Sequence, residues 1–460
     1  MNILLRPAHR CAPWKRLLGS LRKSSDDNNS DINDINDIIV GDNTSSIDTL
    51  GSPAPWKSMP SDAPPPLGQA HIRHCMDPCL ASLPPNSEPS FYACHIDRYA
   101  AMALQPITLH RLLHTGTPPL TRERLLANAQ YLHKERPVRY AKHVKLFQQL
   151  PFIVNLNPNL HALYTAYYAH FEELRQQPEV RTEEDQNAFV AMLVRQSDAL
   201  CDIMPGVARG FHECRAYLGA AARGRFLNEL IHKRIALRLL TDQHIALHRQ
   251  LTAAQQQQEQ GCGIAGAADQ RLQGIIDTRL SLADAVRASA QEVQAACELT
   301  YGDAPAFTVD DHTGACFCYV APHLDYVLTE MLKNAFHASV QSGHVAHSVE
   351  ITVAQGAGRV AVRVRDSGGG IPREIRKRVF DYAFTTATDQ ADVGAPPTDA
   401  AFGNIAREQA PIAGLGFGLP MARVYAEFFG GSLHIISIEG RGCDVFLELP
   451  SIEQSKARKI

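Results

Sequence analysis

The chain has 460 residues, and its 45 Lys and Arg against 48 Asp and Glu give a formal net charge of −3. This balance argues against a protein that binds nucleic acid through an overall basic charge, and no apolar run is long enough to predict a membrane-spanning helix. Eleven cysteines are scattered from Cys11 to Cys443, which is typical of reduced thiols rather than of a disulfide scaffold.

The first 90 residues differ in composition from the rest. Residues 1–25 contain six Lys or Arg and no acidic residue, interleaved with Leu and Trp, which is typical of a mitochondrial transit peptide; a basic tail is the alternative. Residues 26–90 hold first seven Asp without a basic residue and then ten Pro, so we interpret them as a disordered acidic, then Pro-rich linker. The cluster His71, His74, Cys75 and Cys79 has irregular spacing, and we interpret it as chance rather than a metal site.

Residues 91–275 show helical periodicity and predict a bundle. Apolar residues recur three and four apart in segments 125–150, 160–174, 187–220 and 224–248. Pro137 and Pro151 are expected to interrupt this pattern, and the Gln- and Gly-rich stretch 253–266 to form a loop. The bundle by itself indicates no chemistry.

Residues 276–450 mix strands and helices. Strands are predicted at 349–353, 360–364, 433–438 and 443–449, and helices at 323–342, 372–380 and 418–429. The predicted class is therefore α+β, with an N-terminal helical bundle followed by an α/β sandwich in which helices cover one face of a mixed sheet. Residues 451–460 form a short tail.

One helix of this region carries three polar residues on a single face. Glu330, Lys333 and Asn334 are three and four residues apart, so a carboxylate base, a cation and an oxygen ligand for Mg²⁺ project together. An ordinary solvated stripe would have the same spacing.

Glycine-rich motifs follow. Asp366 ends a strand and precedes Gly368 and Gly370, which suits an approach to a flat ligand such as adenine; a simple turn is the alternative. Thr385 and Thr386 could face phosphates or cap a turn. The residues Gly414, Gly416 and Gly418 precede a helix and could cradle phosphate, although the motif is weak alone and is neither a Rossmann nor a P-loop pattern. Residues 387–413 are expected to form a mobile lid.

Together these motifs resemble a known family. Glu-x-x-Lys-Asn-Ala, Asp-x-Gly-Gly-Gly-Ile, Thr-Thr-Ala and Gly-x-Gly-x-Gly-Leu-Pro are similar to the ATP-binding domain of gyrase, Hsp90, histidine kinases and MutL. More closely, residues 95–450 resemble mitochondrial protein kinases of 2-oxo-acid dehydrogenase complexes. Strings in the helical region such as 136–139, 150–153 and 225–240 support this resemblance.

The resemblance implies a role for each motif residue. Glu330 is implied as the general base, Lys333 as a nearby charge, Asn334 as the Mg²⁺ ligand, and Asp366 as the partner of the adenine amine. The residues implied to line ATP are Gly368, Gly370, Thr385, Thr386, Gly414, Gly416, Gly418 and Leu419. Those implied to bind K⁺, largely through backbone oxygens, are Val379, Asp381, Phe384 and Gly416.

The resemblance also implies partners and a location. The substrate would be a Ser of the E1α subunit, and the helical domain would dock the lipoyl domain of the E2 core. A homodimer and the mitochondrial matrix are expected. Tyr326 replaces a His of some pyruvate-type members, and their C-terminal Asp-Trp pair is absent, so the pyruvate complex is favoured only slightly over the branched-chain complex. A sensor-type histidine kinase and a noncatalytic scaffold are weaker alternatives.

Overall fold

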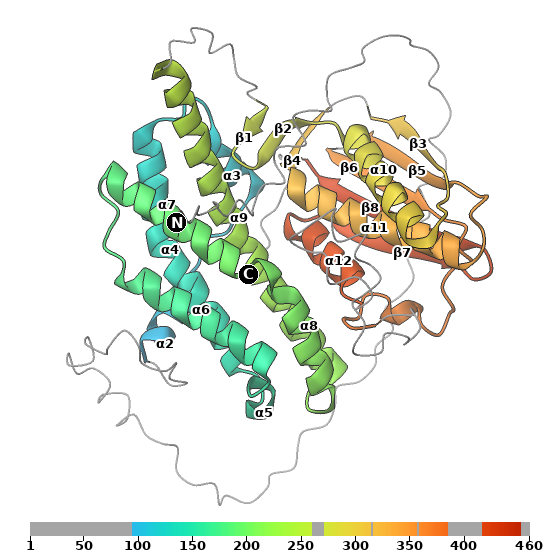
Figure 1. Ribbon diagram of the computed structural model, residues 1–460, viewed down its shortest axis with the longest axis horizontal. Helices are drawn as coiled ribbons and strands as arrows, with labels where there is room; N and C mark the ends of the chain where they lie inside the picture. The colour runs from blue at the N-terminus through green and yellow to red at the C-terminus, as the bar shows by residue number, and fades with distance from the viewer. Residues whose placement is uncertain (1–93, 260–270, 314–315, 357, 385–415, 452–460) are drawn as a thin grey trace, which may run out of the picture. The chain divides into compact units, whose positions relative to one another are not determined.

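The computed structural model describes residues 94–259, 271–313, 316–356, 358–384 and 416–451. Within these ranges, helices occupy the chain up to Glu259, and strands alternate with helices from Leu272 onward (Figure 1). The predicted α+β class is confirmed. The expected transit peptide, linker and His/Cys cluster lie outside the described residues, as does the tail beyond Ser451.

The helical region consists of eight described α-helices. Their bounds are α2 (Cys94–Ala100), α3 (Leu109–Gly116), α4 (Arg122–Gln148), α5 (Phe152–Asn155), α6 (Pro158–Gln176), α7 (Glu183–Ala199), α8 (Met204–Glu213) and α9 (Ala220–Glu259). The N-cap side chains of Thr121, Asn157 and Thr182 accept hydrogen bonds from backbone N–H groups of the first turn of α4, α6 and α7. These caps satisfy donors that have no partner inside a helix, so they fix where each helix begins.

Pro137 does not end a helix, contrary to the sequence-based expectation. Helix α4 runs through it, because buried neighbours hold the chain on both sides. The Arg136 side chain is 1% exposed and donates to the Tyr140 hydroxyl at 3.0 Å and to Gln196 Oε1 at 2.9 Å. Tertiary contacts thus outweigh the backbone hydrogen bond that proline cannot make.

Two other helix boundaries also differ from the prediction. The segment 187–220 divides into α7 and α8 with a 3₁₀ turn (Cys201–Ile203) between them and another (Cys214–Ala216) after α8. Helix α9 continues to Glu259, so the first part of the expected 253–266 loop is helical. Glutamine and alanine are good helix formers, which explains why low complexity did not end the helix.

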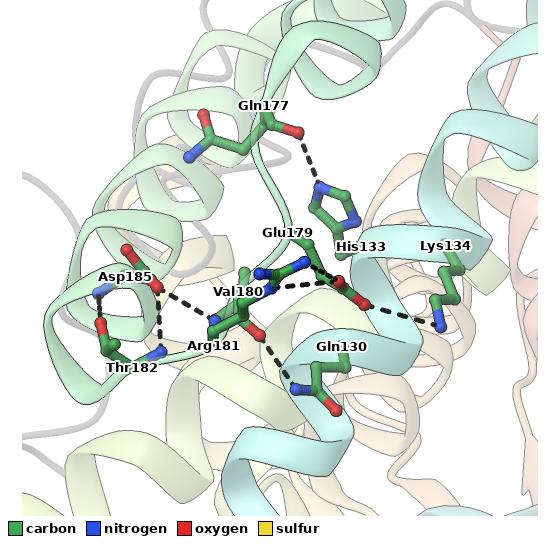
Figure 2. A network of polar contacts seen from close by, with 9 residues as sticks. All are labelled: Gln130, His133, Lys134, Gln177, Glu179, Val180, Arg181, Thr182 and Asp185. Atoms are coloured by element: carbon green, nitrogen blue, oxygen red, sulfur yellow. Dashed lines mark hydrogen bonds and ion pairs between the residues drawn. The ribbon is translucent and has the colours of Figure 1, made fainter.

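The loop between α6 and α7 is fastened to α4 by polar contacts (Figure 2). The Gln130 side-chain amide donates to Val180 O at 3.0 Å, and His133 Nε2 lies 3.0 Å from Gln177 O. Thr182 and Asp185 form a capping box at the start of α7. The loop carbonyls therefore find partners on α4, and this fixes the direction in which α7 leaves the loop.

The second region is built on a five-stranded mixed sheet. Its strands, in spatial order, are β3 (Phe307–His312), β5 (Val349–Gly356), β6 (Arg359–Arg365), β8 (Gly442–Pro450) and β7 (Ser432–Ile438). Only the β3–β5 pair is parallel. A smaller sheet contains β1 (Leu272–Gln273), β2 (Ile276–Leu280) and β4 (Phe317–Val320).

Alternate residues of the large sheet form its buried face. Ile351 pairs with Val364, which pairs in turn with Val445, and all three are buried. Helices α10 (Leu282–Tyr301), α11 (Ala321–Gln341) and α12 (Gly418–Phe428) lie against the sheet (Figure 1). This two-residue alternation is what a sheet with one covered face requires.

The helix expected at 372–380 is wrong. The structure has only one 3₁₀ turn there, Arg376–Arg378, and no residue from 371 to 380 is fully buried. A charged segment without an apolar stripe has nothing to pack against the sheet, so tertiary contacts do not extend the turn.

The division into two domains near residue 275 stays a prediction. One cluster of buried side chains includes residues from both regions, from Ile96 to Leu449.

Among the described helices, none combines the length and the apolar character needed to cross a bilayer.

The buried histidine of α4 predicts acid sensitivity. His143 is 0% exposed, and burial lowers its pKa to about 3, against an ordinary value of 6.5. Between these values the unfolded chain binds a proton that the folded chain does not. The free energy of unfolding should therefore fall as the pH drops from 6.5 towards 3, by about 2 kcal/mol at pH 5 from this residue.

Urea unfolding of the wild type and His143→Gln between pH 7.5 and pH 5 measures this contribution. The variant should show a flatter dependence on pH. The exposed His434→Gln, as an equal substitution on the surface, should keep the slope of the wild type. An unchanged slope in His143→Gln would contradict the prediction.

Candidate active site

Helix α11 presents the three polar residues singled out in the sequence. Lys333 Nζ donates to Glu330 Oε1 at 3.1 Å, and both side chains are largely buried. Asn334 is exposed, and its amide nitrogen donates to the Glu330 carbonyl oxygen at 2.6 Å. Because that nitrogen is engaged, the Asn334 carbonyl oxygen remains as the group available to a ligand.

The Glu330 carboxylate lies against the first residue of α12. A Cβ atom added to Gly418 would be 2.0 Å from Glu330 Oε2, so the helix start and the carboxylate are in direct proximity. Phe417 at the N-cap makes no side-chain capping bond. The positive end of the α12 dipole and the Lys333 ammonium both face the Glu330 side chain.

Tyr326 packs one turn before Glu330 on α11. Its ring lies 4.9 Å from the ring of Tyr425, and it is buried. Burial, and after it the charge of Glu330, raises the pKa of Tyr326 well above 10. The phenol therefore stays protonated.

Asp366 forms the second part of the site, at the end of β6. It is 6% exposed, and its Oδ1 accepts from Gly368 N at 2.9 Å and from Cys443 N at 3.2 Å. Burial raises the pKa of Asp366, while these two backbone donors lower it. No described residue donates to Oδ2, which leaves that oxygen to accept from a ligand.

The glycines after Asp366 are required by close backbone contacts. Gly370 has φ +73°, and a Cβ there would be 2.2 Å from Ile438 O. A Cβ on Gly368 would be 2.5 Å from the Ala338 Cβ on α11. Ser437 Oγ accepts from Ile371 N at 2.7 Å, which ties the turn to the end of β7. The turn is thus held between α11 and the β7–β8 hairpin.

One face of α11 connects the two parts of the site. Glu330, Asn334 and Ala338 are successive residues four apart, so they share a face. Glu330 meets the start of α12, and Ala338 meets the Gly368 turn. Eight residues of helix span about 12 Å, comparable to the reach from a purine base to a terminal phosphate.

Three of the residues proposed to bind a monovalent cation lie in the short segment 379–384, and the fourth, Gly416, lies beside that segment. Phe384 N donates to Asp381 O at 3.3 Å, and a Cβ on Gly416 would be 2.3 Å from Phe384 O. Val379 follows the 3₁₀ turn directly. Neutral carbonyl oxygens suit a cation such as K⁺. No group of three His, Cys, Asp or Glu gathers as a metal site in the part of the chain that the structure describes.

The structure brings most of the predicted residues together. Leu419 follows Gly418 in the first turn of α12 and packs partly buried against the core. Thr385, Thr386, Gly414 and the expected lid at 387–413 lie outside the described residues.

Several residues of the site were missed by sequence reasoning. Ser437 and Cys443 contact the site from segments that carried no motif of their own. The Glu-Gly-Arg-Gly hairpin turn at 439–442 was the one available signal, because a Cβ on Gly442 would be 1.9 Å from Asp366 O.

Comparison with known proteins agrees with this geometry. Residues 106–277 match the family model described as mitochondrial branched-chain alpha-ketoacid dehydrogenase kinase. Residues 319–453 match that of histidine kinase-, DNA gyrase B- and HSP90-like ATPases. The pyruvate dehydrogenase (acetyl-transferring) kinase of Arabidopsis thaliana is 29% identical over 368 residues, covering 78% of this chain and 94% of the relative.

Relatives occur in animals and fungi as well. The human kinase isozyme 3 of the same name is 26% identical over 384 residues, covering 79% of this chain and 87% of its own. Kinase 1 of Saccharomyces cerevisiae is 25% identical over 367 residues, covering 77% and 86% respectively.

The fold and the matching family model define an ATP-binding domain of the histidine kinase, gyrase B and Hsp90 class. The helical region distinguishes the chain within this broad class, because it matches the second family model, that of mitochondrial branched-chain alpha-ketoacid dehydrogenase kinase. In both regions the chain is thus similar to mitochondrial 2-oxo-acid dehydrogenase kinases.

Gly370→Ala should destabilise the site far more than Gly369→Ala. Both residues have positive φ, so both substitutions strain the backbone by about 1 kcal/mol. Only Gly370 faces a backbone oxygen at 2.2 Å, whereas Gly369 has open space. Denaturant unfolding should show a loss of about 1 kcal/mol for Gly369→Ala and of more than 3 kcal/mol for Gly370→Ala. Equal losses would contradict this account of the turn.

Proposed function

We propose that this protein transfers the γ-phosphate of ATP to a serine of the E1α subunit of a pyruvate dehydrogenase complex and thereby inactivates it. The observation that carries the proposal is the polar face of α11. One end of this face places the Glu330 carboxylate beside the start of α12, and the other end lies against the turn that follows the buried Asp366. The length of helix between these ends is comparable to the length of ATP. The names of the relatives from plants, animals and yeast supply the substrate.

Glu330 is the proposed general base. A protein hydroxyl entering beside α12 loses its proton as the phosphate is transferred, and a carboxylate in reach can accept it. Lys333, whose Nζ lies 3.1 Å from Glu330 Oε1, orients that carboxylate and adds positive charge near the phosphates.

Asn334 is the proposed ligand of Mg²⁺. Its exposed side chain offers a neutral, hard oxygen, which fits this ion. When bound with ATP, Mg²⁺ supplies charge neutralisation at the phosphate oxygens.

Asp366 is the proposed adenine partner. Its Oδ1 is occupied by two backbone donors, so Oδ2 can accept from the exocyclic amine. Gly368 and Gly370 would let the base approach the backbone, and Gly416, Gly418 and Leu419 would offer N–H groups to phosphate at the start of α12. The roles of Thr385, Thr386 and Gly414 remain predictions from the sequence.

A K⁺ ion is proposed next to the phosphates. Carbonyl oxygens around Val379, Asp381, Phe384 and Gly416 fit its preference for neutral oxygen ligands. The ion would supply positive charge where the chain reaches α12.

The proposals for partners and location rest on the similarity to mitochondrial 2-oxo-acid dehydrogenase kinases. We propose that the helical region docks the lipoyl domain of the E2 core, that the kinase is a homodimer and that it works in the mitochondrial matrix. The names of the relatives give a mitochondrial location, which supports the last of these.

A branched-chain 2-oxo-acid dehydrogenase is the second candidate substrate. The description of the family model that matches residues 106–277 favours it. A sensor-type histidine kinase is a weaker alternative, and acid stability of the transferred phosphate separates it from a serine kinase.

Transfer of labelled phosphate to purified pyruvate and branched-chain E1, each with its E2 core, tests the proposal. We expect acid-stable label on the E1α of the pyruvate complex at a rate at least tenfold above the branched-chain one. Faster labelling of the branched-chain E1 would replace the proposed substrate, and an acid-labile product would replace the reaction.

Glu330→Gln should lower kcat for phosphate transfer by about 100- to 10,000-fold, because the amide cannot accept the proton. Gly418→Ala should also lower kcat, since the new methyl group must displace the Glu330 carboxylate. Affinity for ATP, measured by calorimetry, should change less than threefold in Glu330→Gln. Normal transfer by this variant would exclude Glu330 as the base.

A further inference from the structure

One hydrogen bond joins the helical region to the site. The hydroxyl of Tyr382 donates to Asn228 Oδ1 on α9 at 2.6 Å, across 154 residues of sequence. Tyr382 is 5% exposed, so its hydroxyl has little access to water as an alternative partner. The bond therefore sets where the Tyr382 ring lies.

The Tyr382 ring in turn contacts the residue that starts α12. Its centroid is 5.3 Å from that of Phe417, which is 1% exposed. The Phe417 carbonyl accepts from Met421 N at 3.0 Å, the first turn of α12. A shift of the Tyr382 ring would move this turn, because a close-packed interior leaves no room to absorb it.

The backbone after Tyr382 needs such an anchor. Ala383 has φ +61° and is the one non-glycine residue with positive φ in the described ranges. Its N–H donates to Gly416 O at 3.1 Å. A strained residue of this kind persists only when its surroundings over-determine it, and Tyr382 supplies two of the constraints.

The first turn of α12 lies against the Glu330 carboxylate. Gly418, next to Phe417, is the residue on which a Cβ would meet Glu330 Oε2 at 2.0 Å. Helix α9 also contacts the far end of α12, where the His232 and Phe428 rings are 4.8 Å apart. Helix α9 thus supports α12 at both ends.

We propose that Asn228 and Tyr382 are positioning residues for phosphate transfer. Asn228 orients Tyr382, Tyr382 holds Phe417, and Phe417 sets Gly418 against the Glu330 carboxylate. A residue of the helical region thereby determines how well the base is placed, although neither residue touches a substrate. This inference rests on the proposed function for its kinetic readout.

Four variants test the hydrogen bond. Tyr382→Phe removes the hydroxyl alone, Asn228→Leu removes the acceptor, and Asn228→Asp keeps an acceptor oxygen. Tyr319→Phe is the matched control, because Tyr319 is equally buried but lies on β4. Kinetics of phosphate transfer, ATP binding and amide hydrogen exchange in the first turn of α12 are measured on the full chain.

Tyr382→Phe and Asn228→Leu should each lower kcat by about fivefold to tenfold, as the loss of one hydrogen bond allows. The KM for ATP should change by a smaller factor than kcat, because the Asp366 end, proposed to hold the adenine, is untouched. The double variant should lose no more than either single one. Asn228→Asp and Tyr319→Phe should stay within twofold of the wild type.

Wild-type kcat in Tyr382→Phe, or losses that multiply in the double variant, would overturn the inference. Hydrogen exchange separates this result from a failure of the proposed function. If the wild type labels no E1, the exchange of the Met421 amide, which donates to Phe417 O, still decides. Faster exchange in Tyr382→Phe and Asn228→Leu, but not in Asn228→Asp, supports the inference. Unchanged exchange overturns it.

Discussion

The contact on which the site depends is that of the Glu330 carboxylate with the first residue of α12. Only a glycine at 418 leaves room for it, since any side chain would begin 2.0 Å from Glu330 Oε2. The helix start offers backbone N–H groups and a positive dipole end, which attract both a carboxylate and a phosphate. In the proposed function, this shared attraction brings the general base next to the phosphate of the nucleotide, and the rest of the domain maintains that proximity.

The large sheet supports the contact between Glu330 and the start of α12 from one side, and the helical region supports it from the other. Paired valines and isoleucines of β5, β6 and β8 support α11, whose polar face carries Glu330 and Asn334. The Asp366 turn is pressed between Ala338 and Ile438, so its position follows from packing rather than from flexible polar contacts. On the other side, Tyr382 and Asn228 join α12 to α9. The Glu330 end and the Asp366 end of the site are therefore both held in place relative to α11.

Buried polar groups in the helical region have a different consequence. His143 and Arg136 are almost completely buried, and each relies on partners from its own or a neighbouring helix. Such groups cost desolvation free energy, and they specify one arrangement of the helices because any other would leave them unpaired. They also make stability depend on pH, through the neutral imidazole of His143. The arrangement of the helices that pack around α9 is thus specified by polar as well as apolar contacts.

The sequence by itself determined the fold class, the order of the four motifs and the sharing of one helix face by Glu330, Lys333 and Asn334. These features follow from local rules: helical spacing of three and four residues, two-residue alternation in strands, and glycine where the backbone must turn. The local rules failed at two places. At Pro137 the packing of buried neighbours keeps the helix continuous, and at 372–380 the absence of such packing leaves only a 3₁₀ turn where a helix was predicted. Only the tertiary structure decided that Gly418 meets Glu330, that Ser437 and Cys443 secure the Asp366 turn, and that Tyr382 reaches Asn228. These contacts join residues that are tens to more than a hundred positions apart, and no local periodicity records which distant side chains a folded core brings together.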